Sequence, residues 1–295
     1  MTKVFKVAEH CFSLSLPDSS ELWGLLGQYD PFVCDGVSDT LFSLSLTESA
    51  PDVETELVLD PETVEGETLV RLFRAGDGWM VESTPDKSIP IVSRLWTNSD
   101  WTEGKLQLVR PAAKQMALFA VNNALMIMYA FVTAPLGTLE MHASVIRCEG
   151  RAFLFLARSG TGKSTHSRMW LENIPGSELL NDDNPVVRAY PDGRVICYGS
   201  PWSGKTPCYR NIEAPVGAFV RIRRCPENKI QKLDIFNAYA MLYSSSSGFK
   251  ADRKMADGLH ETIEAIVTDT PCYVLDCRPD AEAARVCSDA VLWNR

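Results

Sequence analysis

The stretch A-R-S-G-T-G-K-S, from Ala157 to Ser164, decides the fold expected for this chain. It matches the P-loop pattern G-x-x-x-x-G-K-[ST], except that Ala157 replaces the first glycine. The pattern requires a strand before it and a helix after it. Residues 152–156 are a continuous apolar run, and residues 163–172 are a compact helical segment that ends before Pro175. The sequence therefore predicts a strand, a glycine-rich turn and a helix in that order.

The glycines of this motif predict an anion-binding turn. Gly160 and Gly162 permit backbone angles that point successive N–H groups inward, and the helix adds the positive end of its dipole. Lys163 is then expected to reach the β- and γ-phosphates of a nucleoside triphosphate, and Ser164 to bind Mg²⁺. The predicted nucleotide-binding residues are Ser159, Gly160, Thr161, Gly162, Lys163, Ser164 and Thr165. The alternative is a glycine-rich turn that precedes Lys-Ser by chance.

An acidic pair follows at Asp182 and Asp183, behind a short apolar segment at Leu179 and Leu180. Adjacent side chains on a strand point to opposite sides. One carboxylate is thus expected to bind metal while the other acts as general base for an incoming hydroxyl. We assign Ser164 and Asp183 as metal ligands, although the roles of the two aspartates could be exchanged. The alternative is a polar turn, since Asn and Asp both favour turns.

The segment after the acidic pair predicts an antiparallel hairpin over residues 186–190 and 195–198. A doubly wound protein would instead continue through a helix to a parallel strand. Four features carry a family resemblance: Met141-His142, the S-G-T-G-K-S motif, Asp182-Asp183 and the predicted hairpin. Through these features, residues 139–225 resemble the HPr kinase/phosphorylase family. The catalytic domain of that family shares its core with phosphoenolpyruvate carboxykinase.

The resemblance implies a mixed α/β (α+β) P-loop core with ATP and Mg²⁺ as cofactors and a possible homo-oligomer. It also implies that His142, 21 positions before Lys163, lies near the γ-phosphate or the acceptor. Taken alone, His142 would more often be a core histidine. The chain departs from the family at Thr165, where an acidic residue is typical. Its later signature is replaced by Y-G-S-P-W-S-G-K-T-P over residues 198–207.

That replacement segment is a further candidate for the site. Lys205 and Arg210 could bring positive charge to a phosphate in transfer. The alternative is a surface turn formed by Pro201 and Gly204. The four serines at residues 244–247 predict a flexible loop.

The domain boundary is expected near Pro111. Residues 1–110 predict a β-rich region of unknown role, with strands over residues 11–16, 41–46, 55–59, 69–73, 79–82 and 91–95. Residues 111–295 predict the P-loop kinase-like domain, including a leading helix over residues 112–131. Asn122 and Asn123 interrupt the apolar residues 116–136, which favours a buried helix over a membrane span.

Composition narrows the class of protein. The formal net charge of −9 and the lack of a dense Lys/Arg run argue against a nucleic-acid partner. The chain has nine cysteines, an odd number, and no CxxC pair. This pattern is typical of a protein in a reducing cytoplasm. No signal peptide is recognisable at the N-terminus.

Together these features favour an ATP-dependent kinase that phosphorylates a serine-like hydroxyl on a protein, peptide or small molecule. Two alternatives stay open: a carboxykinase-like enzyme acting on a metabolite, and a nucleotide-sensing module without catalysis.

Overall fold

The computed structural model describes residues 1–36, 39–62, 68–109, 113–204, 206–248 and 252–293. The chain forms two compact units, each with its own sheet. The first comprises Met1–Thr133 with Gly248–Arg253, and the second comprises Ala134–Ser247 with Lys254–Arg295. The fold is mixed α/β, as the sequence predicts.

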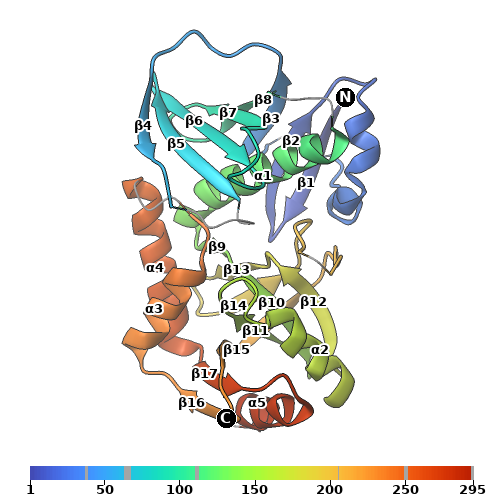
Figure 1. Ribbon diagram of the computed structural model, residues 1–295, viewed down its shortest axis with the longest axis vertical. Coiled ribbons are helices and arrows are strands. Elements are labelled where there is room, and N and C mark those ends of the chain that lie inside the picture. The colour runs from blue at the N-terminus through green and yellow to red at the C-terminus, as the bar shows by residue number, and fades with distance from the viewer. Residues whose placement is uncertain (37–38, 63–67, 110–112, 205, 249–251, 294–295) are drawn as a thin grey trace. The chain divides into compact units, whose positions relative to one another are not determined.

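The first unit contains an eight-stranded sheet in the order β1-β2-β3-β8-β7-β6-β5-β4 (Figure 1). Its strands are β1 (Thr2–Val7), β2 (His10–Ser15), β3 (Phe42–Thr47), β4 (Thr55–Leu59), β5 (Leu69–Ala75), β6 (Gly78–Thr84), β7 (Ser93–Thr97) and β8 (Glu103–Leu108). Two short 3₁₀ helices, η1 (Glu21–Leu25) and η2 (Gly27–Phe32), connect β2 to β3. Strands β1 and β8 were not predicted, because their charged residues obscure the apolar alternation.

Helix α1 (Lys114–Thr133) packs on β3, β6, β8 and η1 and therefore belongs to the first unit. The N-terminal part of this unit thus extends to Thr133, whereas the sequence suggested a boundary at residue 110. The segment Lys114–Leu136 is long and apolar enough to cross a membrane, and 56% of its apolar window is buried within the protein. The polar side chain of Asn122 has partners within the first unit. Its carbonyl oxygen accepts hydrogen bonds from the side chains of Gln28 and Tyr29, at 3.1 and 2.8 Å.

The second unit contains a nine-stranded mixed sheet, with the path β12-β10-β11-β15-β14-β13-β9 and with β17 and β16 beyond β15. Its strands are β9 (Thr138–Glu140), β10 (Ala143–Cys148), β11 (Arg151–Leu156), β12 (Glu178–Asp183), β13 (Val186–Ala189), β14 (Val195–Tyr198), β15 (Glu213–Arg224), β16 (Lys229–Lys232) and β17 (Cys272–Cys277). The predicted hairpin is present as β13 and β14. The long strand β15 pairs with β14 near its start and in parallel with β11 and β17 further on.

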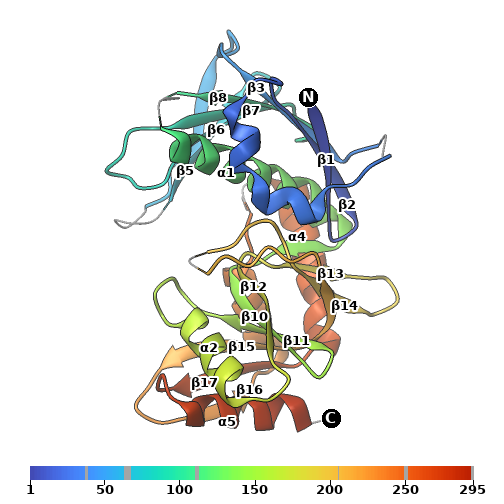
Figure 2. The same ribbon diagram turned by 90° about the vertical axis from the view of Figure 1, so that its right-hand side faces the viewer.

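Helices cover both faces of this sheet. Its helices are α2 (Lys163–Asn173), α3 (Ile235–Ser245), α4 (Arg253–Asp269) and α5 (Ala281–Trp293), with the 3₁₀ turn η3 (Ala134–Leu136) at the start of the unit. Alternate residues of β11 face opposite cores: Leu154 packs with α3 and α4, whereas Phe153 and Phe155 pack with Trp170 of α2 and with α5. Figure 2 shows α2 and α5 in front of the sheet and α4 behind it.

The segment before the glycine-rich turn forms two strands, β9 and β10, interrupted at Met141 and His142. One prediction close to it is corrected. The serine run is not a free loop, because Ser244 and Ser245 end helix α3. Two backbone hydrogen bonds join this serine run to the segment that contains Glu140 and His142. The Ser247 N–H donates to the Glu140 carbonyl oxygen at 2.8 Å, and the His142 N–H donates to the Ser245 carbonyl oxygen at 2.8 Å.

Candidate functional site

The glycine loop, residues 157–162, connects β11 directly to α2. Gly160 and Gly162 have φ angles of +73° and +125°, a region that favours glycine. Gly162 caps α2, and no side chain in the described part of the protein caps the first N–H groups of this helix. Those N–H groups and the helix dipole make the start of α2 a suitable place for an anion.

A cavity of about 440 Å³, named here the loop cavity, opens at this turn. It is lined by His142, Ser159, Gly160, Gly162, Lys163, Ser164, Thr165, Asp182, Asp183 and Gly204. Most of the residues singled out in the sequence therefore meet at one place. Thr161 lies instead on two adjoining cavities, of about 720 and 540 Å³.

Lys163, His142 and Asp183 form a continuous polar chain. The Lys163 Nζ lies 2.6 Å from His142 Nε2 and 3.2 Å from the Ala157 carbonyl oxygen. The His142 Nδ1 lies 3.1 Å from Asp183 Oδ1. These partners fit the neutral tautomer in which Nδ1–H donates to Asp183 and Nε2 accepts from the ammonium group. Burial lowers the pKa of Lys163, and the charges of Asp183 and Asp182 oppose that shift.

Ser164 pairs with Asp182 rather than with Asp183. The Ser164 hydroxyl lies 3.0 and 3.2 Å from the two carboxylate oxygens of Asp182. The metal pair assigned from the sequence, Ser164 with Asp183, is thus not the pair in contact. A hydroxyl beside a carboxylate is a hard oxygen donor set that suits Mg²⁺, which completes its shell with water and phosphate oxygens. Within the described ranges there is no cluster of three or more His, Cys, Asp or Glu that could hold a metal.

Both aspartates line the same cavity, although neighbouring strand residues were expected to point apart. Asp183 has a φ of +106°, which ends the regular alternation of β12. The two side chains can therefore reach different partners, Ser164 and His142, within one site. A non-glycine residue in this conformation is strained, and such strain concentrates at functional sites.

The segment after β14 approaches the acidic pair. The Ser203 hydroxyl and the Gly204 N–H both donate to the Asp182 carbonyl oxygen, at 2.9 and 2.7 Å. A Cβ atom at Gly204 would come within 2.8 Å of the Asp183 Cβ, so this approach requires glycine. Lys205 lies outside the described residues.

Arg210 is not brought to the loop cavity. Its guanidinium donates to Glu178 Oε2 at 2.7 Å and to the Leu179 carbonyl oxygen at 2.6 Å, at the start of β12. Asp182 and Asp183 lie at the other end of that strand. The contact with Arg210 lowers the pKa of Glu178, as expected for an ion pair. The role predicted for Arg210 at a transferring phosphate has no support in this geometry.

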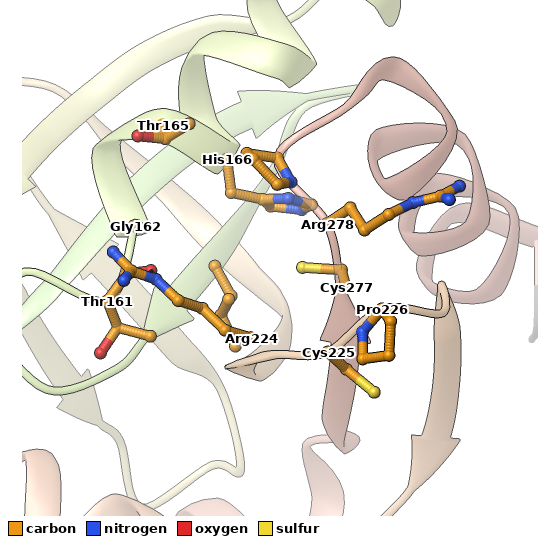
Figure 3. A pocket seen from close by; sticks show the side chains of 11 residues that line it. Thr161, Gly162, Thr165, His166, Arg224, Cys225, Pro226, Cys277 and Arg278 are labelled. Carbon is orange, nitrogen blue, oxygen red and sulfur yellow. Dashed lines mark hydrogen bonds between the residues drawn. The ribbon is translucent and has the colours of Figure 1, made fainter.

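Arg224 was not predicted and supports the glycine loop from β15. Its side chain donates to the carbonyl oxygens of Thr161 and Gly160, at 2.9 and 2.5 Å. Figure 3 shows it reaching toward Thr161 along the cavity of about 720 Å³, which we call the side cavity. That cavity is also lined by His166, whose pKa burial lowers to about 4. His166 is thus a neutral ring, and its Nε2 accepts a hydrogen bond from Trp170.

Glu140 was also missed from the sequence, where it sits in an otherwise ordinary strand pattern. Its side chain is 2% exposed, and neither carboxyl oxygen has a hydrogen-bond partner among the described residues. Burial raises its pKa to about 8, and the negative charge of Asp183 adds to the shift. An acidic residue two positions before His142 was the signal that could have drawn attention to it.

Comparison with known proteins identifies little. No protein-family model matches the chain, and no curated protein matches it. Among solved structures, the HPr(Ser) kinase/phosphatase from Coxiella burnetii aligns with 10% sequence identity and a TM-score of 0.32. That alignment covers 52% of this chain and 96% of the other. A similarity at this level carries no argument about activity, so the candidate site rests on its own geometry.

Proposed function

We propose that this protein is an ATP-dependent phosphotransferase that moves the γ-phosphate of MgATP to a hydroxyl group. One observation carries the proposal. The loop cavity gathers a glycine turn at a helix N-terminus, a buried lysine, a serine–aspartate pair and a histidine–aspartate pair. These groups suit phosphoryl transfer, because catalysis of that reaction is mainly positioning and charge stabilisation.

The residues divide into two groups around the phosphate. The N–H groups of the glycine loop and the Lys163 ammonium would hold the β- and γ-phosphates. Ser164 and Asp182 would hold Mg²⁺, which neutralises charge on the phosphate oxygens when it is bound. The side cavity adjoins the loop at Gly162 and offers about 720 Å³ for the nucleoside.

Asp183 and His142 would serve the acceptor. The acceptor oxygen attacks the γ-phosphorus, and the bond from that phosphorus to the bridging oxygen breaks, so that ADP leaves with the electron pair. The hydroxyl proton passes to the Asp183 carboxylate. The Nδ1 of His142 lies 3.1 Å from that carboxylate and keeps it oriented.

The first test is calorimetric binding of MgATP and MgGTP to the wild type and to Lys163→Ala. We expect the variant to weaken nucleotide binding by at least about tenfold, since a charge-assisted contact contributes about 1.5–3 kcal/mol. Equal binding by both proteins would contradict the assignment of the phosphate site.

A second pair of variants separates the two aspartates. Asp183→Asn should keep nucleotide binding and lose phosphate transfer by about a hundredfold or more, within the usual range for general-base catalysis. Asp182→Asn should raise the Mg²⁺ concentration needed for nucleotide binding. Tight nucleotide binding without transfer to any acceptor would favour the nucleotide-sensing alternative instead.

A further inference from the structure

A third cavity, of about 540 Å³, lies beside the loop cavity and shares His142 with it. We call it the basic cavity. It is lined by His142, Ala157, Arg158, Thr161, Arg221, Ile222, Arg223, Ala240, Ser244 and Ser245. Three of these residues are arginines, and none of the described lining residues is acidic. This concentration of positive charge is notable in a chain whose formal net charge is −9.

The charges of these arginines are compensated unequally. Arg223 is neutralised by Asp276, with Nε and Nη2 at 2.7 and 2.8 Å from the two carboxylate oxygens. Arg221 donates to the Ser244 hydroxyl at 2.6 Å and has no carboxylate partner in the described part of the chain. The Arg158 carbonyl oxygen accepts a hydrogen bond from the Thr161 N–H at 3.1 Å within the glycine loop. The Arg158 guanidinium makes neither a hydrogen bond nor an ion pair with any described residue.

The electrostatics of Arg221 agree with this arrangement. Burial lowers its pKa, and the neighbouring charges of Arg223 and Arg158 lower it further. Two guanidinium groups, those of Arg158 and Arg221, thus line a cavity in which no described residue supplies a carboxylate to balance them. Guanidinium groups bind carboxylate and phosphate through paired, charge-assisted hydrogen bonds.

The position of the basic cavity connects it to the proposed reaction. Ala157, Arg158 and Thr161 belong to the glycine loop, and His142 contacts both Lys163 and Asp183. A small molecule in this cavity would therefore lie next to the γ-phosphate held in the loop cavity. The described lining of the loop cavity includes neither Arg158 nor Arg221, so these arginines are available for a second ligand.

We propose that the phosphate acceptor is a small anionic hydroxyl compound whose carboxylate or phosphate binds Arg158 and Arg221. Its hydroxyl then faces His142 and Asp183. This inference rests on the proposed function and names the substrate class of the same site. The new oxygen–phosphorus bond forms on the acceptor hydroxyl, ADP leaves, and the anionic group is unchanged.

The test uses the full chain with MgATP and measures ADP release with matched acceptors. The pairs are glycerate with glyceramide, for a carboxylate, and glycerol 3-phosphate with glycerol, for a phosphate. We expect one anionic acceptor to exceed its neutral partner by at least about tenfold in kcat/KM. Which pair shows the difference identifies the anion.

Arg221→Gln and Arg158→Gln should each lower kcat/KM for the anionic acceptor by about 10- to 100-fold, the range of a lost charge-assisted contact. The KM for ATP should stay within about twofold. Arg147→Gln is the matched control, because Arg147 pairs with Glu178 and lines none of the three cavities. It should leave both constants unchanged.

Three outcomes would overturn the proposal. The first is equal use of anionic and neutral acceptors. The second is a loss of MgATP binding, rather than of acceptor use, in the two arginine variants. The third applies if no acceptor is phosphorylated, and it is measured by calorimetry with glycerate and glycerol 3-phosphate. It is the finding that wild-type protein binds MgATP but binds neither of these two anions. Failure of MgATP to bind at all would instead count against the proposed function.

Discussion

Glu140 shows at the scale of one residue how a buried acid is tolerated beside a charged site. Its carboxyl group is 2% exposed, has no hydrogen-bond partner among the described residues and is repelled by Asp183. Burial of an unpaired charge is costly, so the neutral form is favoured. Glu140 therefore keeps its proton at neutral pH.

This state predicts a pH dependence of stability. The pKa of Glu140 is about 8 in the folded protein against an ordinary value of 4.5. Between these values the folded chain holds a proton that the unfolded chain has lost. Raising the pH from 4.5 to 8 should therefore lower the free energy of unfolding, by up to about 5 kcal/mol at about 1.4 kcal/mol per pKa unit.

Urea denaturation of the wild type and of Glu140→Gln over this pH range checks the prediction. The amide cannot ionise, so the variant should lose less stability than the wild type as the pH rises. Glu213→Gln, at an exposed position of β15, is the control and should follow the wild type. Parallel pH profiles for wild type and Glu140→Gln would show that Glu140 does not titrate in this way.

At the scale of an element, the turn between β11 and α2 depends on backbone conformation more than on side-chain space. A Cβ atom at Gly162 would meet only the Thr165 Cβ, at 3.9 Å, so a methyl group fits there. The φ of +125° is nevertheless unfavourable for alanine. Replacing this glycine therefore tests the shape of the turn itself.

Gly162→Ala should reduce MgATP affinity by about tenfold or more, because the N–H groups at the start of α2 would turn away from the phosphates. It should also destabilise the fold by about 1 kcal/mol. Gly176→Ala is the matched control, since Gly176 has a φ of +77° with open space around its Cβ. It should show a similar loss of stability in urea denaturation and unchanged affinity in calorimetry. Equal affinity losses in both variants would argue against a specific role for the turn.

At the scale of the whole molecule, the nine cysteines are all free thiols. Six of them are buried, whereas Cys11, Cys34 and Cys225 are partly exposed. Burial raises the pKa of Cys272 to about 12 and that of Cys277 to about 11, which suppresses the reactive thiolate. Reaction with a thiol reagent should thus begin at the partly exposed positions.

Cys225 can test the proposed nucleotide site, because it lines the side cavity in the second unit. If the nucleoside occupies that cavity, MgATP should lower the labelling rate of Cys225 in proportion to the fraction of protein that remains free of nucleotide. Cys34, in the first unit, should react at the same rate with or without MgATP. Peptide mass spectrometry after timed labelling gives both rates. Equal labelling of Cys225 in both conditions would place the nucleoside elsewhere.

The sequence by itself determined the elements whose signals are local. Apolar runs and turn residues predicted β11, α2 and the hairpin of β13 and β14, and the motif from Ser159 to Ser164 predicted the glycine turn between β11 and α2. Tertiary structure alone decided the rest. A positive φ turned Asp183 toward His142 and left Asp182 with Ser164. An ion pair with Glu178 held Arg210 at the far end of β12, and β15 placed Arg221 in the basic cavity and Arg224 against the glycine loop. Such contacts depend on strand order and register between distant segments, and no local pattern encodes them.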